Sequence, residues 1–311
     1  MNKDEMIKGS IYGVAAGDAL GAPCEFMRPD AVKLRWGTVD TMIKSYSWAA
    51  GEFTDDTWLT LATIRAYENY QTGGLDVPRA GQSMVIWMQN IGKGIGNMTN
   101  RALGKISSGQ CTAYESGKKA AVNAAHGSAG NGSLMRCAST GLIHDSTKID
   151  IITKEATVLS EITHADQRCV AACVAYNVIL AHILDGKDFS ESMTKAADAA
   201  RQIDAETCNI IEEVMRGGGN TFDLNNMKNQ GFVLRSLQRG LIAYRDGLNF
   251  KDPMVEIVNE GGDADTNGAV AGGLLGAKFG FSGIPSEWTS ALQYQDEINE
   301  AVEIVRKARG I

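Results

Sequence analysis

The chain has 311 residues, of which 44% are hydrophobic and 22% are charged, and it carries a formal net charge of −7 with a pI near 5.2. Its length and composition are those of an ordinary globular protein, with room for one large domain or two small ones. The acidic balance argues against a general binder of phosphate backbones, because such a protein normally carries a basic surface.

Targeting and membrane signals are missing from the sequence. The first ten residues have mixed charge and no apolar stretch, unlike a secretory signal. The longest apolar run, residues 169–184, is shorter than the roughly 20 residues that span a bilayer and predicts a buried core helix. The six cysteines are scattered without a CxxC pair or a spacing typical of zinc. We expect a reduced cytoplasmic monomer with no membrane partner.

The first predicted helix covers residues 5–20, where Ile7, Ile11 and Val14 recur at helical spacing. Asp18 continues the same stripe, and a buried carboxylate there needs hydrogen-bond donors or a cation. A row of glycines on the neighbouring face would let another backbone approach closely: Gly13, Gly17 and Gly21. Such a row is equally consistent with plain helix packing and with a functional role.

The rest of the chain also reads as helices joined by glycine-rich loops, with almost no alternating strand pattern and no solenoid repeat. We expect a loop up to residue 50, a plain loop at "NIGKGIGN", and a turn at "HGSAGNGSLMR" that leads into a helix. The expected helices after the first one cover residues 55–70, 82–89, 115–125, 150–163, 166–184, 190–201, 204–215, 230–245 and 287–309. A single all-α domain, residues 1–311, is the simplest interpretation.

The stretch "FTDDT" raises the first question of chemistry. Thr54, Asp55 and Asp56 suit the start of a helix, where they would satisfy free backbone amides and the helix dipole. They would also suit half of a metal site, and this stretch alone favours the helix start.

A second acidic group, Asp263, Asp265 and Thr266 in "GGDADTNG", changes that balance. An EF-hand is excluded because its twelfth position, which should be a glutamate, is Leu274. Two helix starts with four carboxylates and two hydroxyls offer only oxygen donors, which Mg²⁺ and Mn²⁺ prefer. Crowding these acids without a cation would be unfavourable.

Three further features are weaker on their own. The glycine-rich turn at residues 126–136 could hold a phosphate group, although it matches neither GxGxxG nor a P-loop. His164 could be a polar cap or a site residue. Glu25 could be an acid, a metal ligand or simply an exposed residue.

Taken together and in order, "GVAAGDALGAPCEF", "FTDDT", "GNGSLMR", "THADQRC" and "GGDADTNGAVAGGLLGAKFG" resemble the ADP-ribosylglycohydrolase family of the dinitrogenase reductase-activating type. These stretches span residues 13–280. The resemblance implies a compact orthogonal helical bundle, with two Mg²⁺ or Mn²⁺ ions in a cleft.

The resemblance also implies a role for each matching residue. The metal ligands would be Thr54, Asp55, Asp56, Asp263, Asp265 and Thr266, with Glu25 beside them as ligand, gate or acid/base group. The general base would be Glu25, Asp55 or Asp56. The substrate would be held by His126, Gly127, Ser128, Ala129, Gly130, Asn131, Gly132, Ser133 and His164, and Asp18 would support the ligands from behind.

The activity implied is hydrolysis at C1″ of the distal ribose, which releases ADP-ribose from a modified protein or a small derivative such as O-acetyl-ADP-ribose. Nucleic acid is an unlikely partner except as a modified substrate. Ser128 stands where some arginine-directed members have an acid, which weakens an arginine assignment without establishing serine. Two alternatives stay open: a relative that binds ADP-ribose or is crystallin-like without turnover, and a binuclear hydrolase of another nucleotide or glycoside.

Overall fold

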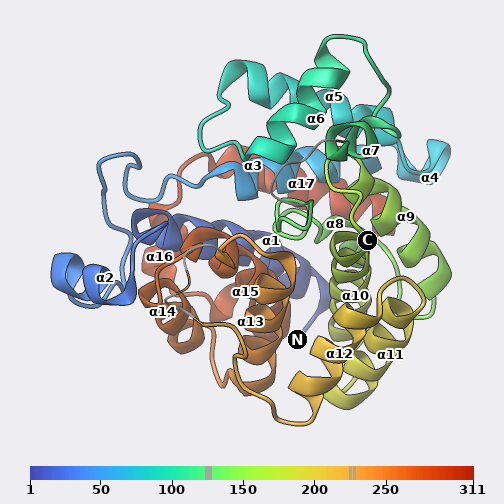
Figure 1. Ribbon diagram of the computed structural model, residues 1–311. Helices are drawn as coiled ribbons and strands as arrows, with labels where there is room; N and C mark the ends of the chain where they lie inside the picture. Colours follow the sequence, from blue (N-terminus) through green and yellow to red (C-terminus); the bar gives the residue numbers. More distant parts are fainter. Residues whose placement is uncertain (123–127, 224–225, 227–228) are drawn as a thin grey trace.

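The computed structural model describes residues 1–122, 128–223, 226 and 229–311, which are folded almost entirely as helices (Figure 1). No β-ladder forms among these residues, and two isolated bridges join Met27 to Gly262 and Gly130 to Phe232. The all-α prediction is therefore confirmed. The α-helices are α1 (Lys3–Gly21), α2 (Pro29–Trp36), α3 (Asp55–Ile64), α4 (Tyr70–Gly73), α5 (Val77–Asn90), α6 (Asn97–Ser107), α7 (Ser116–Ala121), α8 (Ser139–Ile143), α9 (Ile149–Glu161), α10 (Gln167–Leu184), α11 (Phe189–Arg201), α12 (Ala205–Met215), α13 (Val233–Asp246), α14 (Lys251–Asn259), α15 (Ala264–Phe279), α16 (Ser286–Ala291) and α17 (Gln295–Arg309).

Helix α10 is the apolar run that the sequence predicts as a core helix. It is long and apolar enough to cross a membrane by length and composition, but every residue from 169 to 184 is buried by the surrounding protein. Helices α9, α11 and α12 pack around it, and Figure 1 shows them gathered on one side of the molecule. The prediction of a core helix is confirmed.

Three expectations about helices are wrong, and α6 and α14 match no expected helix. The helix expected at 55–70 ends at Ile64, where a short 3₁₀ turn follows. Residues 21–50 are not all loop, because α2 begins at Pro29 and stands out at the edge of the molecule (Figure 1). Only Val32 of α2 is buried, so no apolar stripe marks this helix in the sequence. The expected helix at 287–309 is two helices, because Tyr294 has a left-handed backbone (φ 54°) and the amide of Gln293 donates to the carbonyl of Gly51 instead.

The closest helix pair is α1 with α15, which run antiparallel and meet along glycines. A Cβ atom on any glycine of this α1 row would overlap a backbone carbonyl oxygen of α15. The facing pairs are Gly9 with Gly276, Gly13 with Gly272, Gly17 with Gly268, and Gly21 with Ala264. We call these residues the glycine seam. It confirms the close backbone approach that the glycine row predicts, and it sets the end of α1 beside the start of α15.

The glycine seam predicts that Gly272→Ala destabilises the protein. Its new Cβ would overlap the carbonyl oxygen of Gly13, which is backbone and cannot move aside. Overpacking of this kind costs about 1–3 kcal/mol, to be measured as a fall in the urea unfolding free energy.

Gly104→Ala is the matched control, because Gly104 is an exposed residue of α6 with no atom within 4 Å of an added Cβ. The control should be neutral or more stable by up to about 1 kcal/mol. Equal effects of the two substitutions would show that the α1–α15 approach is not tight.

Candidate metal and ligand site

The first acidic group begins α3, and a carboxylate from α1 holds it in place. Asp18 is fully buried and accepts hydrogen bonds from the backbone amides of Thr54 (3.0 and 3.1 Å) and Thr57 (2.9 Å), and from the Thr57 hydroxyl (2.6 Å). Its place on a buried stripe is thereby explained. Thr54 caps the helix, accepting from the Asp56 amide, and its hydroxyl donates to Asp56 Oδ2 at 3.1 Å. "FTDDT" is therefore a helix start, as predicted, and Asp55 and Asp56 also line a cleft.

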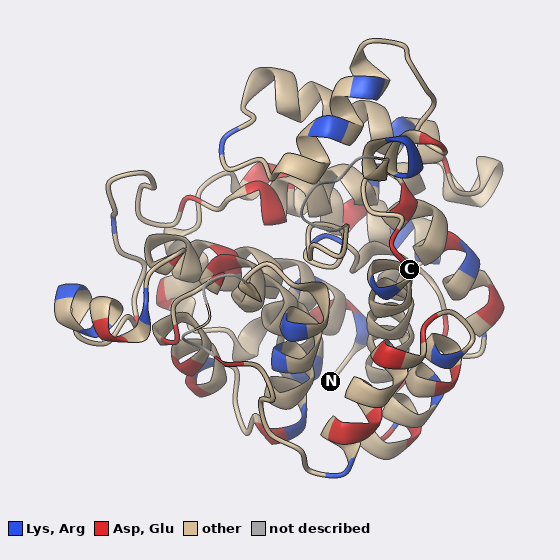
Figure 2. Cartoon of the chain, in the orientation of Figure 1, with Lys and Arg blue, Asp and Glu red and all other residues tan. Residues whose placement is uncertain are grey.

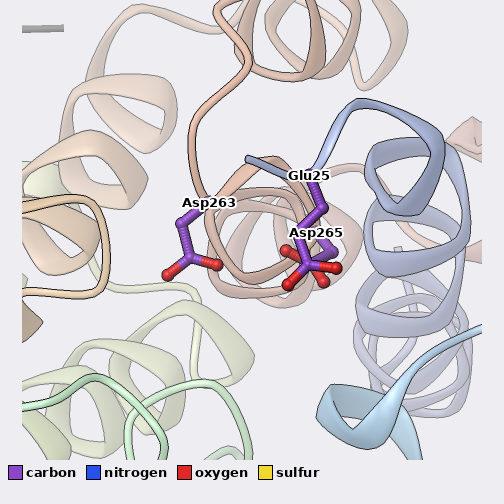
Figure 3. Close-up of side chains that lie close together, drawn as sticks. All are labelled: Glu25, Asp263 and Asp265. Atoms are coloured by element: carbon purple, nitrogen blue, oxygen red, sulfur yellow. The ribbon is translucent and has the colours of Figure 1, made fainter. Parts of the chain in front are cut away.

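The second acidic group begins α15 and meets Glu25. Carboxylate oxygens of Glu25, Asp263 and Asp265 lie within 4.8 Å of one another, an arrangement that could hold a metal ion. Figure 3 shows the Glu25 and Asp265 carboxylates converging, with Asp263 directed to the same space from the start of α15. The sequence analysis places all three at the metals, and the structure brings them together.

Two backbone hydrogen bonds tie the Glu25 segment to the Asp263 segment. The amide of Phe26 donates to the carbonyl of Gly262 (2.6 Å), and the amide of Gly262 donates to the carbonyl of Met27 (2.7 Å). Gly261 and Gly262 both have positive φ (64° and 66°), which glycine adopts without strain. These contacts fix the spacing of the carboxylates through the main chain.

The acidic groups share a cleft of about 650 Å³, a volume typical of small-molecule sites. Its lining includes Glu25, Asp55, Asp56, Asp263, Asp265 and Thr266, together with Ala129, Gly130, Asn131, Gly132 and His164. Thr54 is buried behind Asp56 and does not line the cleft. Arg168 is the one cationic side chain among the described lining residues, against five carboxyl groups.

The crowded carboxylates favour their neutral forms. Burial raises the pKa of Glu25 to about 7, and the charges of Asp263 and Asp18 add to that shift. Burial, followed by the charges of neighbouring carboxylates, raises the pKa values of Asp55, Asp56 and Asp265 well above their usual range. Bound cations would reverse these effects.

One atom gives a direct test of whether these residues fit a metal. Asp56 Oδ1 is buried and has no hydrogen-bond partner among the described residues, although a buried carboxylate oxygen is normally satisfied. An unsatisfied oxygen among oxygen donors is suited to a hard divalent cation. The residues present therefore fit Mg²⁺ or Mn²⁺.

The glycine-rich turn lies beside the acidic groups but does not lead directly into a helix. Residues 132–138 form turns and α8 begins only at Ser139, so the predicted helix N-terminus is absent there. The turn is instead held by the segment before α13: the Asn131 amide donates to the Gly231 carbonyl (3.0 Å), and the Val233 amide to the Ala129 carbonyl (3.1 Å). Pairing with that segment replaces the expected helical hydrogen bonds.

Asn131 links the turn to the acidic residues at the start of α15. Its Nδ2 donates to Asp263 Oδ2 at 2.6 Å and to Ser236 Oγ at 2.9 Å. Because both amide hydrogens are used, Asn131 fixes Asp263 and can offer a ligand only its oxygen.

The other predicted residues of the turn lie in different places. His126 and Gly127 lie outside the described residues. Ser128 and Ser133 do not line the cleft, since Ser128 donates to Asp166 Oδ2 (2.9 Å) and Ser133 accepts from Ser160 (2.9 Å).

The loop at "NIGKGIGN", to which the sequence analysis gives no role, forms part of the cleft wall. Gly94 has φ 87°, and a Cβ there would lie 3.0 Å from Asp55 Oδ1. Lys93 holds the loop by donating to Glu52 Oε1 (2.5 Å) and lying over the Trp48 ring (3.8 Å). The loop matches no nucleotide-binding motif, so the sequence does not show that it lines the cleft. Its position beside Asp55 in the structure does.

Sequence reasoning also missed three larger side chains of the cleft. Phe26 is 68% exposed and has a left-handed backbone (φ 58°), which is unusual for a bulky residue. Arg168 forms a two-point ion pair with Asp166 (both 2.9 Å) and lies 5.7 Å from the ring centre of Phe232. Neither the exposed ring of Phe26 nor the contacts of Arg168 with Asp166 and Phe232 follow from a local sequence pattern, although Arg168 stands four residues after His164 in the chain.

The described residues thus form an all-α fold whose cleft groups carboxylate oxygens beside a glycine-rich turn. The ADP-ribosylglycohydrolase family profile matches residues 1–310, and the chain belongs to this family. The resemblance stated from its motifs is thereby confirmed.

Individual relatives cover almost the whole chain. The chain is 29% identical to the ADP-ribosyl-[dinitrogen reductase] glycohydrolase of Rhodospirillum rubrum, over 97% of this chain and 96% of that protein. It is 28% identical to the ADP-ribosylarginine hydrolase Tri1 of Pseudomonas putida, over 95% and 76%. A solved structure titled ADP-ribosylglycohydrolase-related protein complex has a TM-score of 0.78 at 24% identity and covers 99% of both chains, which supports the fold.

The crowded carboxylates predict how Asp56→Asn changes thermal stability. In chelator the variant should melt at or above the wild-type temperature, because a neutral amide replaces a buried carboxyl group whose charged form is unfavourable there. Adding Mg²⁺ or Mn²⁺ should raise the wild-type melting temperature by several degrees, since a ligand at 100 times its Kd stabilises by about 2.7 kcal/mol. The variant should lose most of that rise.

Asp40→Asn, at an exposed residue, is the charge-matched control and should keep the full rise. A metal response in Asp56→Asn equal to that of the wild type would show that Asp56 is not a ligand.

Proposed function

We propose that this protein hydrolyses the bond between C1″ of the distal ribose and its acceptor in ADP-ribosylated targets, with two Mg²⁺ or Mn²⁺ ions. The observation that carries the proposal is one cleft in which five carboxylates lie beside the 129–132 turn. The family and the names of the Rhodospirillum rubrum and Pseudomonas putida relatives support the same activity.

The cations would be held by Asp55, Asp56, Asp263, Asp265 and Thr266, with Thr54 completing the set or positioning Asp56. When bound, they would neutralise the carboxylates and bind the vicinal hydroxyls of the ribose. Asp18 and Asn131 would keep Asp55, Asp56 and Asp263 in place through the hydrogen bonds described above.

Glu25 would move the proton. It lines the cleft with Asp263 and Asp265, within reach of a water or acceptor atom bound there. The bond from C1″ to the acceptor breaks, a water oxygen bonds to C1″, and the acceptor leaves with a proton. Positive charge develops on the ribose during this step, and the surrounding carboxylates would stabilise it.

A guanidinium is the first acceptor to consider. The cleft is negative next to Phe26, whose exposed ring beside Glu25 could stack on a planar cation. Ser128 lies outside the cleft lining and pairs with Asp166, so it gives no direct contact by which to choose between arginine and serine.

The cell compartment and assembly are part of the proposal. All six cysteines are free, which is consistent with a reducing cytoplasm. We propose a monomer. Figure 2 shows Lys and Arg interspersed with Asp and Glu over most of the described chain. The net charge of −7 favours a protein or small-molecule substrate over nucleic acid.

The deciding experiment offers ADP-ribosylated arginine, serine and nucleic-acid substrates, and O-acetyl-ADP-ribose, to the purified protein. We expect ADP-ribose release with Mg²⁺ or Mn²⁺, and none with chelator. Glu25→Gln should lower the rate by about 10²–10⁴-fold. The exposed Glu287→Gln is the matched control and should leave the rate unchanged.

Two alternatives predict different outcomes. A binding or crystallin-like relative would bind ADP-ribose without releasing it from any substrate. A hydrolase of another nucleotide or glycoside would need metal but reject all four ADP-ribosyl compounds. Either outcome would contradict the proposed function.

A further inference from the structure

Arg136 is a buried cation with neutral neighbours. It is 1% exposed, and its guanidinium donates to the Thr63 hydroxyl (3.2 Å), the Leu159 carbonyl (3.1 Å) and the Thr163 hydroxyl (2.8 Å). No carboxylate pairs with it in the described part of the chain. Burying an unpaired charge is unfavourable, which raises the question of what these hydrogen bonds achieve.

The hydrogen bond between Arg136 and Thr163 has only one possible direction. A guanidinium has no acceptor, so the Thr163 oxygen must accept from it. The Thr163 hydroxyl still has one hydrogen to donate, and its other hydrogen-bond partner among the described residues is His164 Nδ1 at 2.8 Å. The Thr163 oxygen has a second lone pair, but if Nδ1–H donated to it, the hydrogen of this buried hydroxyl would have no acceptor among the described residues. Donation from Thr163 to Nδ1 satisfies both groups, so Nδ1 accepts.

An accepting Nδ1 fixes the state of the imidazole. In a neutral ring, one nitrogen accepts and the other carries the hydrogen, so Nε2 of His164 must be the donor. The ring is neutral because burial and the charge of Arg136 lower the pKa of His164 to about 3.

The donor Nε2 lies at the wall of the cleft, against the glycine-rich turn. A Cβ atom at Gly130 would come within 3.3 Å of Nε2, and one at Gly132 within 3.2 Å. These two glycines therefore leave the space in front of the donor open. Nε2 itself makes no hydrogen bond within the described residues, which leaves it available to a ligand.

We infer that Arg136 and Thr163 act as positioning residues, a relay that holds His164 as an Nε2–H donor for an acceptor oxygen of the bound nucleotide sugar. The identity of that ligand rests on the proposed function, whereas the relay and the tautomer do not. On this account His164 takes no part in proton transfer. Its contribution is one hydrogen bond of fixed direction that costs no ring reorientation when the ligand binds.

The tautomer can be read directly in the ligand-free protein. With ¹⁵N-labelled histidine, long-range ¹H–¹⁵N spectra distinguish Nε2–H from Nδ1–H, and His164→Gln assigns the signal among the four histidines. We expect Nε2–H at pH 7 and at pH 5.5. An Nδ1–H or doubly protonated ring would overturn the inference, whatever the protein hydrolyses.

Paired valine substitutions separate the relay from simple stability. Thr163→Val removes the hydroxyl that fixes His164, and Thr63→Val removes another acceptor of the same guanidinium without contacting the histidine. We expect Thr163→Val to release the Nε2–H preference and weaken ADP-ribose binding about ten-fold in calorimetry. Thr163→Ser should restore both, and Thr63→Val should change neither.

The possible outcomes distinguish this inference from the proposed function. Equal loss of ADP-ribose affinity in both valine variants, or no loss in Thr163→Val, would overturn the relay. A wild-type protein that does not bind ADP-ribose would overturn the ligand assignment. If the tautomer and the affinity pattern are as expected but no substrate is cleaved, the inference holds and the proposed function fails.

Discussion

The close antiparallel approach of α1 and α15 is the contact on which the cleft depends. Four successive steps of the glycine seam bring the two backbones together where any side chain would overlap a carbonyl oxygen. Because the helices are antiparallel, the last turn of α1 lies beside the first turn of α15. Asp18 and Glu25 are thereby brought to Asp263 and Asp265, although some 240 residues separate them in the chain.

From that junction the site is built by hydrogen bonds between backbone and side chain. Asp18 reaches from α1 to fix the start of α3, the Met27–Gly262 bridge fixes Glu25 against Asp263, and Asn131 fixes Asp263 against the glycine-rich turn. Each contact holds a carboxyl group in a place where its charged form is unfavourable unless a cation is bound nearby. The protein therefore uses the stability of a large helical core to keep a strained electrostatic arrangement ready for its ligands.

Sequence reasoning found the parts of the fold that have strong local signals. The glycine row and the apolar run at 169–184 both lead to the observed packing, since spacing alone dictates which face a residue occupies. It missed α2, which buries only Val32, and the break at Tyr294, because these depend on contacts with distant segments. The same limit explains why the helix after the 126–136 turn begins only at Ser139.

For the site, residue chemistry at helix starts sufficed to group Asp55, Asp56, Asp263 and Asp265, and the family resemblance added Glu25 and the turn. What no local pattern could show is which side chains point into the cleft. Ser128 is turned toward Asp166, while Gly94 comes from a loop without a recognisable motif, and Phe26 and Arg168 lie in motif stretches that assign them no role. The direction of the Arg136–Thr163–His164 hydrogen bonds likewise emerges only from their geometry.

A crystal structure with Mn²⁺ and ADP-ribose would test the central claim most directly, because anomalous scattering locates manganese independently of the refined coordinates. The account predicts two manganese peaks between the starts of α3 and α15, at about 2.0–2.2 Å from carboxylate oxygens of both helices, with the distal ribose over them. Manganese bound elsewhere, or ADP-ribose bound away from these carboxylates, would contradict it.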